Sequence, residues 1–301
     1  MKKNSEKEIP IVFTFDDNYV LPAWIAIKSL VRTKNKNTQY KIYCIYQNLC
    51  ENSRKKLDKL ANINWIKFSS ATFDWVPYSW EYPITVYFRL ILHEMLSQYD
   101  KIIYSDVDVL FQWDLSKIYG TNLDGKYWAG VPLEKNVVHS EEFLSKQKWR
   151  PTDPFYLSWH TKFEENTNKY IFASWFMLIN AKKMREDKMT QKFIWLIKKY
   201  KDKLKMFDLE ILNLACQNNT IKKIPFKYCV LEDVSNIKKY RESNTYLFLS
   251  QIYSKKELHN SVLYPKILHY TWANSVRIRD RLPQDQQKRY NKYYNMVKKF
   301  I

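Results

Sequence analysis

The stretch Lys101-Ile102-Ile103-Tyr104-Ser105-Asp106-Val107-Asp108-Val109-Leu110 carries two carboxylates at the end of an apolar run. The run from Lys101 to Tyr104 is typical of a buried strand, and Ser105 to Asp108 marks the point where the chain leaves the sheet. In open α/β sheets, ligands bind at the carboxyl ends of the strands. This stretch therefore predicts a sheet strand and, at its end, a ligand site.

The segments before this stretch alternate between strand and helix patterns. Apolar runs typical of strands cover 9–15, 40–46 and 63–68, and helical spacing of apolar residues covers 21–31, 53–60 and 84–96. Alternation of this kind predicts an α/β fold, with a largely parallel, Rossmann-like sheet and helices on both faces.

The second half continues the pattern after a long polar and aromatic segment, 134–170, which is typical of a functional loop over such a sheet. We expect further strands at 174–180, 221–224 and 266–269, and helices at 182–200 and 208–217. We predict one catalytic domain, 1–276, followed by a basic and aromatic segment, 277–301, with a helix from residue 286 onward.

The segment 277–301 carries eight Lys or Arg against two Asp, with four aromatic residues among them. This composition suits contact with an anionic membrane surface. The alternative is a helix packed on the catalytic domain with its lysines in water.

Composition sets the class of protein. The 301 residues suffice for a large core, and the formal charge of +19 favours an anionic partner, although a coding sequence biased toward A and T would give the same excess of lysine. No apolar run reaches the length of a membrane span, and the polar start from Met1 to Glu8 predicts no signal peptide. We expect a cytoplasmic protein, peripheral at the inner face of the cytoplasmic membrane. Its cysteines, at positions 44, 50, 216 and 229, show no metal-binding spacing, which predicts reduced, structural thiols.

The chain has only three glycines, and none forms a phosphate-binding loop. If the protein binds a diphosphate, something other than a glycine-rich loop must neutralise its charge, and a metal ion is the obvious substitute. Asp106 and Asp108 fit that need because positions i and i+2 of an extended chain share a face, and Mn²⁺ or Mg²⁺ prefers oxygen ligands. Two alternatives are solvated aspartates at a strand end and a phosphatase of the haloacid dehalogenase type. The latter requires the pair after the first strand, followed by Gly and Thr, and neither condition is met.

Several separate motifs between residues 9 and 270 resemble glycosyltransferase family 8, a retaining family that includes bacterial lipopolysaccharide galactosyl- and glucosyltransferases and glycogenin. The motifs are Phe13-Thr14-Phe15-Asp16-Asp17-Asn18-Tyr19, Tyr87-Phe88-Arg89-Leu90, the pair Asp106 and Asp108, Phe176-Met177-Leu178-Ile179-Asn180, Asp208-Leu209-Glu210-Ile211-Leu212-Asn213, and His269-Tyr270.

The resemblance implies a GT-A fold, with a Rossmann-like mixed sheet and helices on both faces. It also implies transfer of a hexosyl group, with retention, from a UDP-sugar to a hydroxyl of a bacterial surface glycan or glycolipid acceptor. It also implies roles for individual residues. Asp106, Asp108 and His269 are the metal ligands, Arg89 and Asp208 the catalytic residues, and Arg89, Ser174, Asp208 and Leu209 the donor-sugar contacts. Nucleotide contacts fall on Phe13, Thr14, Asp16, Asn18, Tyr19, Ser105, Asp106 and Val107, with Tyr19 stacking on the base.

Three positions depart from the family pattern. Trp175 and Trp272 stand where the family has glycine, and Leu209 replaces a glutamine on the donor side. The usual diphosphate lysine is also missing, and Arg277 or Arg279 is the candidate replacement. We expect a narrower pocket with fewer polar partners and a donor preference that is not simply for UDP-galactose, unless Ser174, Asn213 or Glu210 fills the role of the glutamine.

Two other classes remain as alternatives. The charge, together with 50 aromatic residues, is compatible with a nucleic-acid-binding protein, but no recognised nucleic-acid module is present, so we expect no such partner. A degenerate enzyme that binds sugar nucleotides without turnover is the other alternative, and the presence of both D-x-D carboxylates argues against it.

Overall fold

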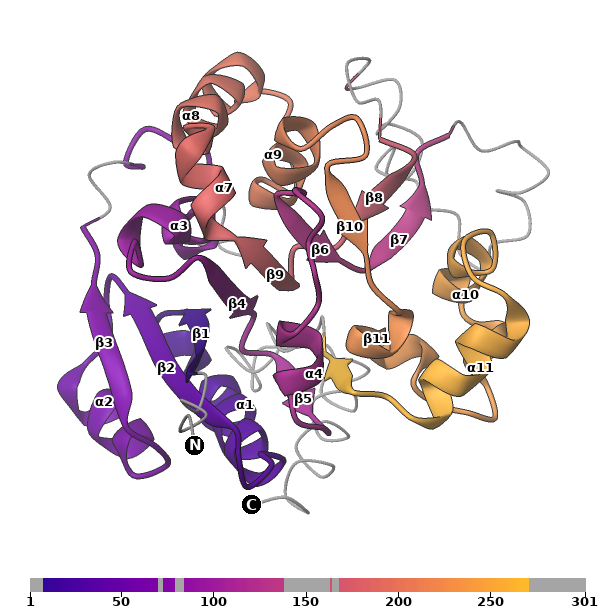
Figure 1. The fold of residues 1–301 in the computed structure, drawn as a ribbon, viewed down its shortest axis with the longest axis horizontal. Coiled ribbons are helices and arrows are strands. Elements are labelled where there is room, and N and C mark those ends of the chain that lie inside the picture. The colour runs from indigo at the N-terminus through magenta and orange to yellow at the C-terminus, as the bar shows by residue number, and fades with distance from the viewer. Residues whose placement is uncertain (1–7, 70–72, 79–83, 138–162, 164–167, 271–301) are drawn as a thin grey trace, which may run out of the picture.

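A seven-stranded mixed sheet forms the centre of the protein (Figure 1). The computed structural model describes residues 8–69, 73–78, 84–137, 163 and 168–270. The strand order is β10-β6-β9-β4-β1-β2-β3, and every neighbouring pair is parallel except those that β9 makes with β4 and β6. The strands are β1 (Glu8–Thr14), β2 (Gln39–Tyr46), β3 (Ile63–Lys67), β4 (Lys101–Ser105), β6 (Trp128–Gly130), β9 (Phe176–Asn180) and β10 (Ile221–Lys223). The predicted mixed α/β sheet is confirmed.

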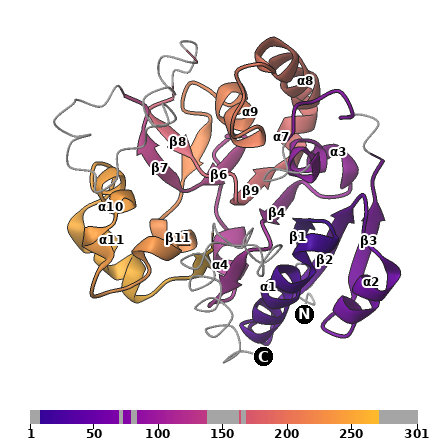
Figure 2. The same ribbon diagram turned by 180° about the vertical axis from the view of Figure 1, so that it is seen from behind.

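Strand alternation divides the core into two layers, one on each face of the sheet. In β1, Ile11 and Phe13 belong to one buried cluster and Val12 to the other. The first cluster is covered by α1 (Val20–Arg32), α2 (Glu51–Asp58), α4 (Ser116–Tyr119) and α11 (Lys255–Leu263). The second is covered by the 3-10 helix η3 (Ile84–Ile91), α3 (Leu92–Met95), α7 (Ala181–Glu186), α8 (Met189–Tyr200) and α9 (Asp208–Ala215). Figure 2, from behind, shows α1 against the first face.

Two small sheets flank the central one. The three-stranded sheet β11-β12-β5 pairs β12 (Ile267–His269) antiparallel with β5 (Val109–Phe111), and so sets His269 opposite Val109. The third strand of this sheet is β11 (Val230–Leu231). The two-stranded sheet consists of β7 (Pro132–Lys135) and β8 (Tyr170–Phe172), which pair antiparallel. The β5–β12 pairing brings His269 next to the D-x-D stretch.

Two predicted helices differ from those observed. The helix expected over 84–96 is instead η3 followed by the short α3, since Ile84, Thr85 and Val86 are β-branched and disfavour a regular α-helical start. The helix expected over 182–200 is interrupted after α7 by Asp187 and Lys188, where Lys188 adopts a left-handed φ of 51°. Asp187 is held there by hydrogen bonds from Lys183 Nζ and Tyr127 OH.

The sequence patterns did not indicate the short strands β5, β6, β7 and β8 or the helices α4, α10 (Asn244–Leu249) and α11. The remaining short helices are η1 (Asp17–Tyr19), η4 (Phe226–Tyr228), η5 (Glu232–Val234) and η6 (Tyr240–Glu242). Most of the segment 134–170, Trp272, Arg277, Arg279 and the whole segment 277–301 lie outside the described residues. Within the described part of the chain, no helix combines the length and the apolar character needed to cross a membrane.

Candidate active site

Main-chain hydrogen bonds on both sides fix the two aspartates of the D-x-D stretch. Asp106 follows β4, and its N–H donates to the carbonyl of Trp175, just before β9, at 2.8 Å. Asp108 precedes β5, and its carbonyl accepts from Tyr270 N–H, just after β12, at 2.8 Å. The two carboxylates therefore lie between the central sheet and the three-stranded sheet, at the carboxyl end of β4.

Asp106, Asp108 and His269 come together as a group of three donors. One ligand atom from each lies within 4.8 Å of the others, and His269 Nε2 is 3.1 Å from Asp108 Oδ1. Two carboxylate oxygens and one imidazole nitrogen make a donor set that suits Mn²⁺ or Mg²⁺. The residues present thus fit the implied metal ion.

Trp175 touches two members of this group. Its indole stacks on the imidazole of His269, with ring centroids 4.5 Å apart and an interplanar angle of 18°. Its carbonyl is the acceptor for Asp106 N–H. The residue that stands in place of a family glycine therefore packs on His269 and accepts a hydrogen bond from Asp106, contacts that the sequence did not indicate.

Arg89, on η3, links Asp106 to Asp208. Its side chain is 5% exposed, its Nη2 donates to Asp106 Oδ1 at 2.8 Å, and its Nη1 lies 3.2 Å from Asp208 Oδ2. The same Nη1 is within hydrogen-bond distance of the carbonyl and the hydroxyl of Ser174, at 3.0 and 3.2 Å. One buried guanidinium thus spans the two sites that the sequence assigned separately to metal and donor sugar.

Tyr104 supports this arrangement from within strand β4. Its hydroxyl donates to Asp106 Oδ1 at 2.6 Å, and the guanidinium of Arg89 lies 4.5 Å from the centre of its ring. Because the Tyr104 proton is used on Asp106, the contact of 3.1 Å with Thr14 Oγ1 has Thr14 as the donor. Burial raises the pKa of Tyr104 well above its ordinary value, so it stays a donor. Sequence reasoning missed Tyr104, which in an apolar strand looks like a core residue.

Asp208 is a buried carboxylate in the first turn of α9. Burial raises its pKa to about 6, with Arg89 opposing the shift and the charge of Asp106 adding to it. Ser174 Oγ donates to Asp208 Oδ2 at 2.9 Å. The preceding residue, Phe207, has a φ of 45° and a ψ of −103°, which is strained for a residue other than glycine. Strain at this junction is consistent with a functional requirement on the position of Asp208.

The pKa of Asp106 is also shifted. Burial raises the pKa of its carboxyl above the ordinary value, Arg89 counteracts this, and the neighbouring Asp108 adds to the rise. Two carboxylates that share a small space favour the uptake of a cation, because a cation removes their mutual repulsion.

The turn after β1 holds the predicted nucleotide residues. Asp16 Oδ1 accepts from the main-chain N–H and the side-chain amide of Asn18 at 2.9 and 3.0 Å. Tyr19 is half-buried against the first core cluster. The neighbouring Asp17 accepts from Cys50 N–H at 3.0 Å and from Ser53 Oγ at 2.8 Å, which ties this turn to the start of α2.

Three other predicted nucleotide residues turn their side chains inward. Phe13 and Ser105 are 0% exposed and Val107 is 4% exposed. At these positions the main chain is the part that a nucleotide can contact. Leu209 is likewise buried, at 4%, and packs in the second core cluster.

Two of the residues considered as replacements for the missing glutamine have structural partners. Glu210 Oε2 accepts from the N–H groups of Lys205 and Met206 at 2.7 and 2.9 Å, which closes the turn before α9. Asn213 pairs with both the N–H and the carbonyl of Phe172, each at 2.9 Å. Ser174, by contrast, lies directly beside Arg89 and Asp208.

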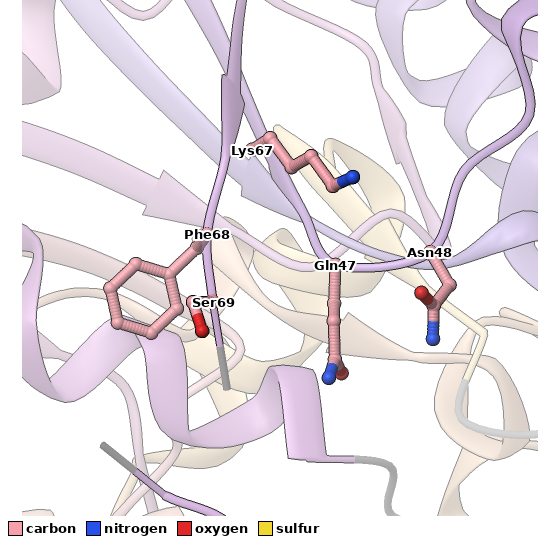
Figure 3. A pocket seen from close by; sticks show the side chains of 5 residues that line it. All are labelled: Gln47, Asn48, Lys67, Phe68 and Ser69. Atoms are coloured by element: carbon pink, nitrogen blue, oxygen red, sulfur yellow. The ribbon is translucent and has the colours of Figure 1, made fainter. Parts of the chain in front are cut away.

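A pocket of about 370 Å³ opens at the carboxyl ends of β2 and β3. It is lined by Gln47, Asn48, Lys67, Phe68 and Ser69. Figure 3 shows the amide groups of Gln47 and Asn48 projecting to the same side. Since Asp17 holds Cys50, two residues after Asn48, this pocket adjoins the Asp16–Tyr19 turn on the same edge of the sheet. None of its residues was predicted from the sequence.

A mixed sheet of this order, with a candidate metal-binding D-x-D stretch at its carboxyl edge and His269 from β12 beside it, is typical of glycosyltransferases of the GT-A type. The chain belongs to glycosyl transferase family 8, whose sequence model matches residues 10–274.

Similarity in sequence and in fold to known proteins supports this assignment. The chain is 22% identical over 284 residues to lipopolysaccharide 1,2-glucosyltransferase of Escherichia coli (strain K12), which covers 90% of this chain and 78% of that protein. The fold of this chain is similar to that of the galactosyltransferase LgtC in complex with donor and acceptor sugar analogues, with a TM-score of 0.64 and 19% identity. The similarity covers 93% of this chain and 100% of the LgtC chain. An active-site mutant of LgtC gives a TM-score of 0.67 at 20% identity, with 96% of each chain covered.

Proposed function

We propose that this glycosyltransferase moves a hexosyl group from a UDP-sugar to a hydroxyl of a lipopolysaccharide, lipooligosaccharide or capsule glycan, with retention at the anomeric carbon. The observation that carries the proposal is the bridge that Arg89 makes between Asp106, at the metal group, and Asp208. The similarity to a lipopolysaccharide glucosyltransferase over 90% of the chain supports the choice of acceptor class.

Each group then has a chemical task. Asp106, Asp108 and His269 would hold a divalent cation, which would supply charge that stabilises the UDP leaving group. Arg89 orients Asp106 and approaches the donor sugar from the buried side. Asp208, when ionised, contacts sugar hydroxyls or stabilises positive charge at the anomeric carbon. Ser174 holds Asp208 through its hydroxyl.

The uridine part of the donor is assigned to the edge formed by β1 and β2. Tyr19 offers a ring for stacking, and the amides of Gln47 and Asn48 offer hydrogen-bond donors and acceptors for a base or ribose. Lys67 adds a positive charge. We also propose that the enzyme works at the cytoplasmic face of the cytoplasmic membrane, where the segment 277–301 contributes to attachment.

A thermal-shift panel tests the proposal. UDP and several UDP-hexoses, with Mn²⁺, are expected to raise the melting temperature, because ligand binding stabilises the native state. UDP release with the best donor then separates an active enzyme from a protein that binds without turnover. Stabilisation by single-stranded DNA alone, with no response to UDP-sugars, would refute the proposal in favour of nucleic-acid binding.

Replacement of Tyr19 by alanine is expected to weaken UDP and UDP-sugar binding equally, by about 1–3 kcal/mol, the range for base stacking on an aromatic side chain. Isothermal titration with UDP measures this loss. Tyr19→Phe keeps the ring and is expected to bind as the wild type does. An unchanged dissociation constant of Tyr19→Ala for UDP would mean that Tyr19 only packs against the core and does not stack on the base.

Replacement of Trp175 by alanine is expected to weaken Mn²⁺ binding by about tenfold, as is usual when a residue that orients a metal ligand is lost. Trp175→Phe, which can still stack on His269, is expected to recover most of the affinity. The paramagnetic resonance signal of free Mn²⁺ gives the affinity without reference to turnover. Trp113→Ala is the control, since Trp113 is also a large indole, 57% exposed, and its ring lies beside Lys266 rather than beside a metal ligand. Equal affinities of Trp175→Ala and the wild type would show that the stacking has no role in metal binding.

The raised pKa of Asp208 predicts a pH effect. Turnover is expected to fall as the pH drops through about 6, because the protonated form lacks the charge needed at the sugar. The effect on stability has the opposite sign. Because the folded-state pKa exceeds the unfolded value of about 3.9, protonation favours the folded state, and this contribution is lost as the pH rises from about 4 through 6.

Urea unfolding of wild type and Asp208→Asn at pH 5 and pH 7 measures this effect on stability. The wild type is expected to lose stability relative to the variant at the higher pH. A difference that does not depend on pH would mean that Asp208 titrates normally.

A further inference from the structure

One surface combines exposed aromatic rings with lysines. It consists of Trp75, Tyr78, Lys192, Trp195, Lys198 and Lys199, and we call it the aromatic–lysine surface. Its three rings are 41%, 63% and 54% exposed, in the order Trp75, Tyr78 and Trp195. Lys198 Nζ lies 5.4 Å from the ring centre of Trp75, so the loop after β3 and the helix α8 form one continuous surface.

The arrangement of α8 explains why these side chains face solvent. Phe193, Leu196 and Ile197 pack into the core, while Lys192, Trp195, Lys198 and Lys199 occupy the opposite face. Lys199 Nζ lies 4.9 Å from the ring centre of Trp195. Exposed aromatic rings that group on one surface, unlike single exposed ones, indicate contact with something outside the chain.

Charge identifies the kind of partner. Residues 188–205 contain seven lysines and one acidic residue, Asp202, whereas the whole chain has 50 basic to 31 acidic residues. The positive charge is therefore concentrated here beyond the general excess. Trp and Tyr favour the membrane–water interface, and clustered lysines are attracted to anionic lipid headgroups. A neutral sugar surface would use the rings but would gain nothing from Lys192, Lys198 and Lys199, the three lysines of this stretch that belong to the aromatic–lysine surface. We propose that the aromatic–lysine surface binds an anionic lipid bilayer.

This surface is connected to the catalytic residues through two sets of contacts. In the loop after β3, Phe73 stacks on Tyr87 with centroids 5.8 Å apart, and Tyr87 OH donates to the carbonyl of Pro77 at 2.8 Å. Tyr87 is two residues before Arg89 on η3. At the end of α8, the chain turns over 201–207 into α9, where Asp208 begins the helix, and α8 and α9 lie side by side in both views (Figures 1 and 2).

Attachment through this surface would hold Arg89 and Asp208 close to a glycolipid acceptor. That consequence depends on the proposed function, whereas lipid binding itself does not.

Vesicle cosedimentation with the full chain tests the inference. The probes are vesicles of phosphatidylcholine alone and of phosphatidylcholine mixed with phosphatidylglycerol. The lysine variant combines Lys192→Gln, Lys198→Gln and Lys199→Gln, and the aromatic variant combines Trp75→Ala and Trp195→Ala. The matched control combines Lys55→Gln, Lys56→Gln and Lys59→Gln, three exposed lysines on and directly after α2.

The wild type and the control are expected to bind the anionic vesicles alike and the neutral vesicles weakly. The lysine variant is expected to bind the anionic vesicles about tenfold more weakly or worse, and the aromatic variant is expected to weaken by a similar factor. A chain ending at Val276 is expected to retain the difference between the lysine variant and the control.

Equal loss in the lysine variant and the control would overturn the inference, because it would show a response to net charge alone. Loss of all vesicle binding on truncation at Val276, with no effect of the lysine variant, would also overturn it. Equal binding to neutral and anionic vesicles would contradict the role given to the lysines. Melting temperatures with and without UDP identify misfolded variants, and vesicle binding without any UDP-sugar binding would refute the proposed function while leaving this inference standing.

Discussion

Asp106→Asn and Asp108→Asn are each expected to reduce metal-dependent turnover by about a hundred- to a thousandfold, the range seen when a group that stabilises developing negative charge is lost. Each substitution removes one negative charge from the three donors that lie within 4.8 Å of each other. A neutral amide oxygen binds a hard divalent cation less well than a carboxylate does. Binding of UDP should lose its dependence on Mn²⁺ for the same reason.

The fold should survive these substitutions. In Asp106→Asn the new side-chain amide oxygen can still accept hydrogen bonds from Arg89 and Tyr104, and the pKa of Asp106 is already raised by burial, so a neutral group at this position is tolerated. Titrations of UDP with Mn²⁺ and with EDTA measure the metal dependence, and urea unfolding measures stability.

Asp114→Asn is the matched control. Asp114 is also buried, but it accepts hydrogen bonds from Asn35 N–H, Tyr40 OH and Ser116 N–H. It is not one of the three donors of the candidate metal site. Its loss should lower stability and leave the Mn²⁺ dependence of UDP binding unchanged. Full activity of the wild type in EDTA would show that the metal assignment is wrong.

Local patterns in the sequence were enough to predict the longer strands and the place of the D-x-D stretch at the end of β4. The alternation of apolar runs with helical spacing holds for β1, α1, β2, α2, β3 and β4, because each of these segments is long enough to show its period. The three-residue strands β5 and β6 are too short to show a period, and the patterns did not indicate them. The break between α7 and α8 depends on contacts of Asp187 with Tyr127, 60 residues away, and no local pattern could reveal it.

The contacts between side chains inside the candidate site could not be predicted from the sequence either. The resemblance to a family pointed to Arg89, Asp106, Asp208 and His269 one at a time. It did not indicate that Arg89 joins Asp106 to Asp208, although Asp208 lies 119 residues after Arg89 in the chain. It also did not indicate that Trp175 stacks on His269. Such contacts depend on how the sheet brings distant segments together and on the rotamers that packing then permits.

Arg89→Met is expected to combine the second-largest loss of activity with a large loss of stability. The guanidinium is 5% exposed and pairs with Asp106 and Asp208, so its removal leaves one partly buried and one buried carboxylate without their shared cation. Breaking a buried ion pair from one side costs about 3–5 kcal/mol. Turnover should fall at least about a hundredfold, because both carboxylates lose the group that orients them.

The loss of stability should depend on pH, and its sign follows from the carboxylates that remain. Burial already raises the pKa of Asp208 to about 6, and Arg89 opposes that rise. Without Arg89 the folded-state pKa of Asp208 moves further above the unfolded value, so protonation favours the folded variant. Arg89→Met should therefore be closer to wild-type stability at pH 5 than at pH 7.

Two further variants separate charge from geometry. Arg89→Lys keeps a positive charge but lacks the planar fork that reaches both carboxylates, so it should regain part of the stability and little of the turnover. Arg185→Met removes another partly buried arginine, one that donates to the carbonyls of His93 and Tyr99. It should lower stability without a comparable change in Mn²⁺ affinity or turnover. If Arg89→Lys proved fully active, the bridge between Asp106 and Asp208 would need only a charge, and the mechanism proposed for Arg89 would be wrong.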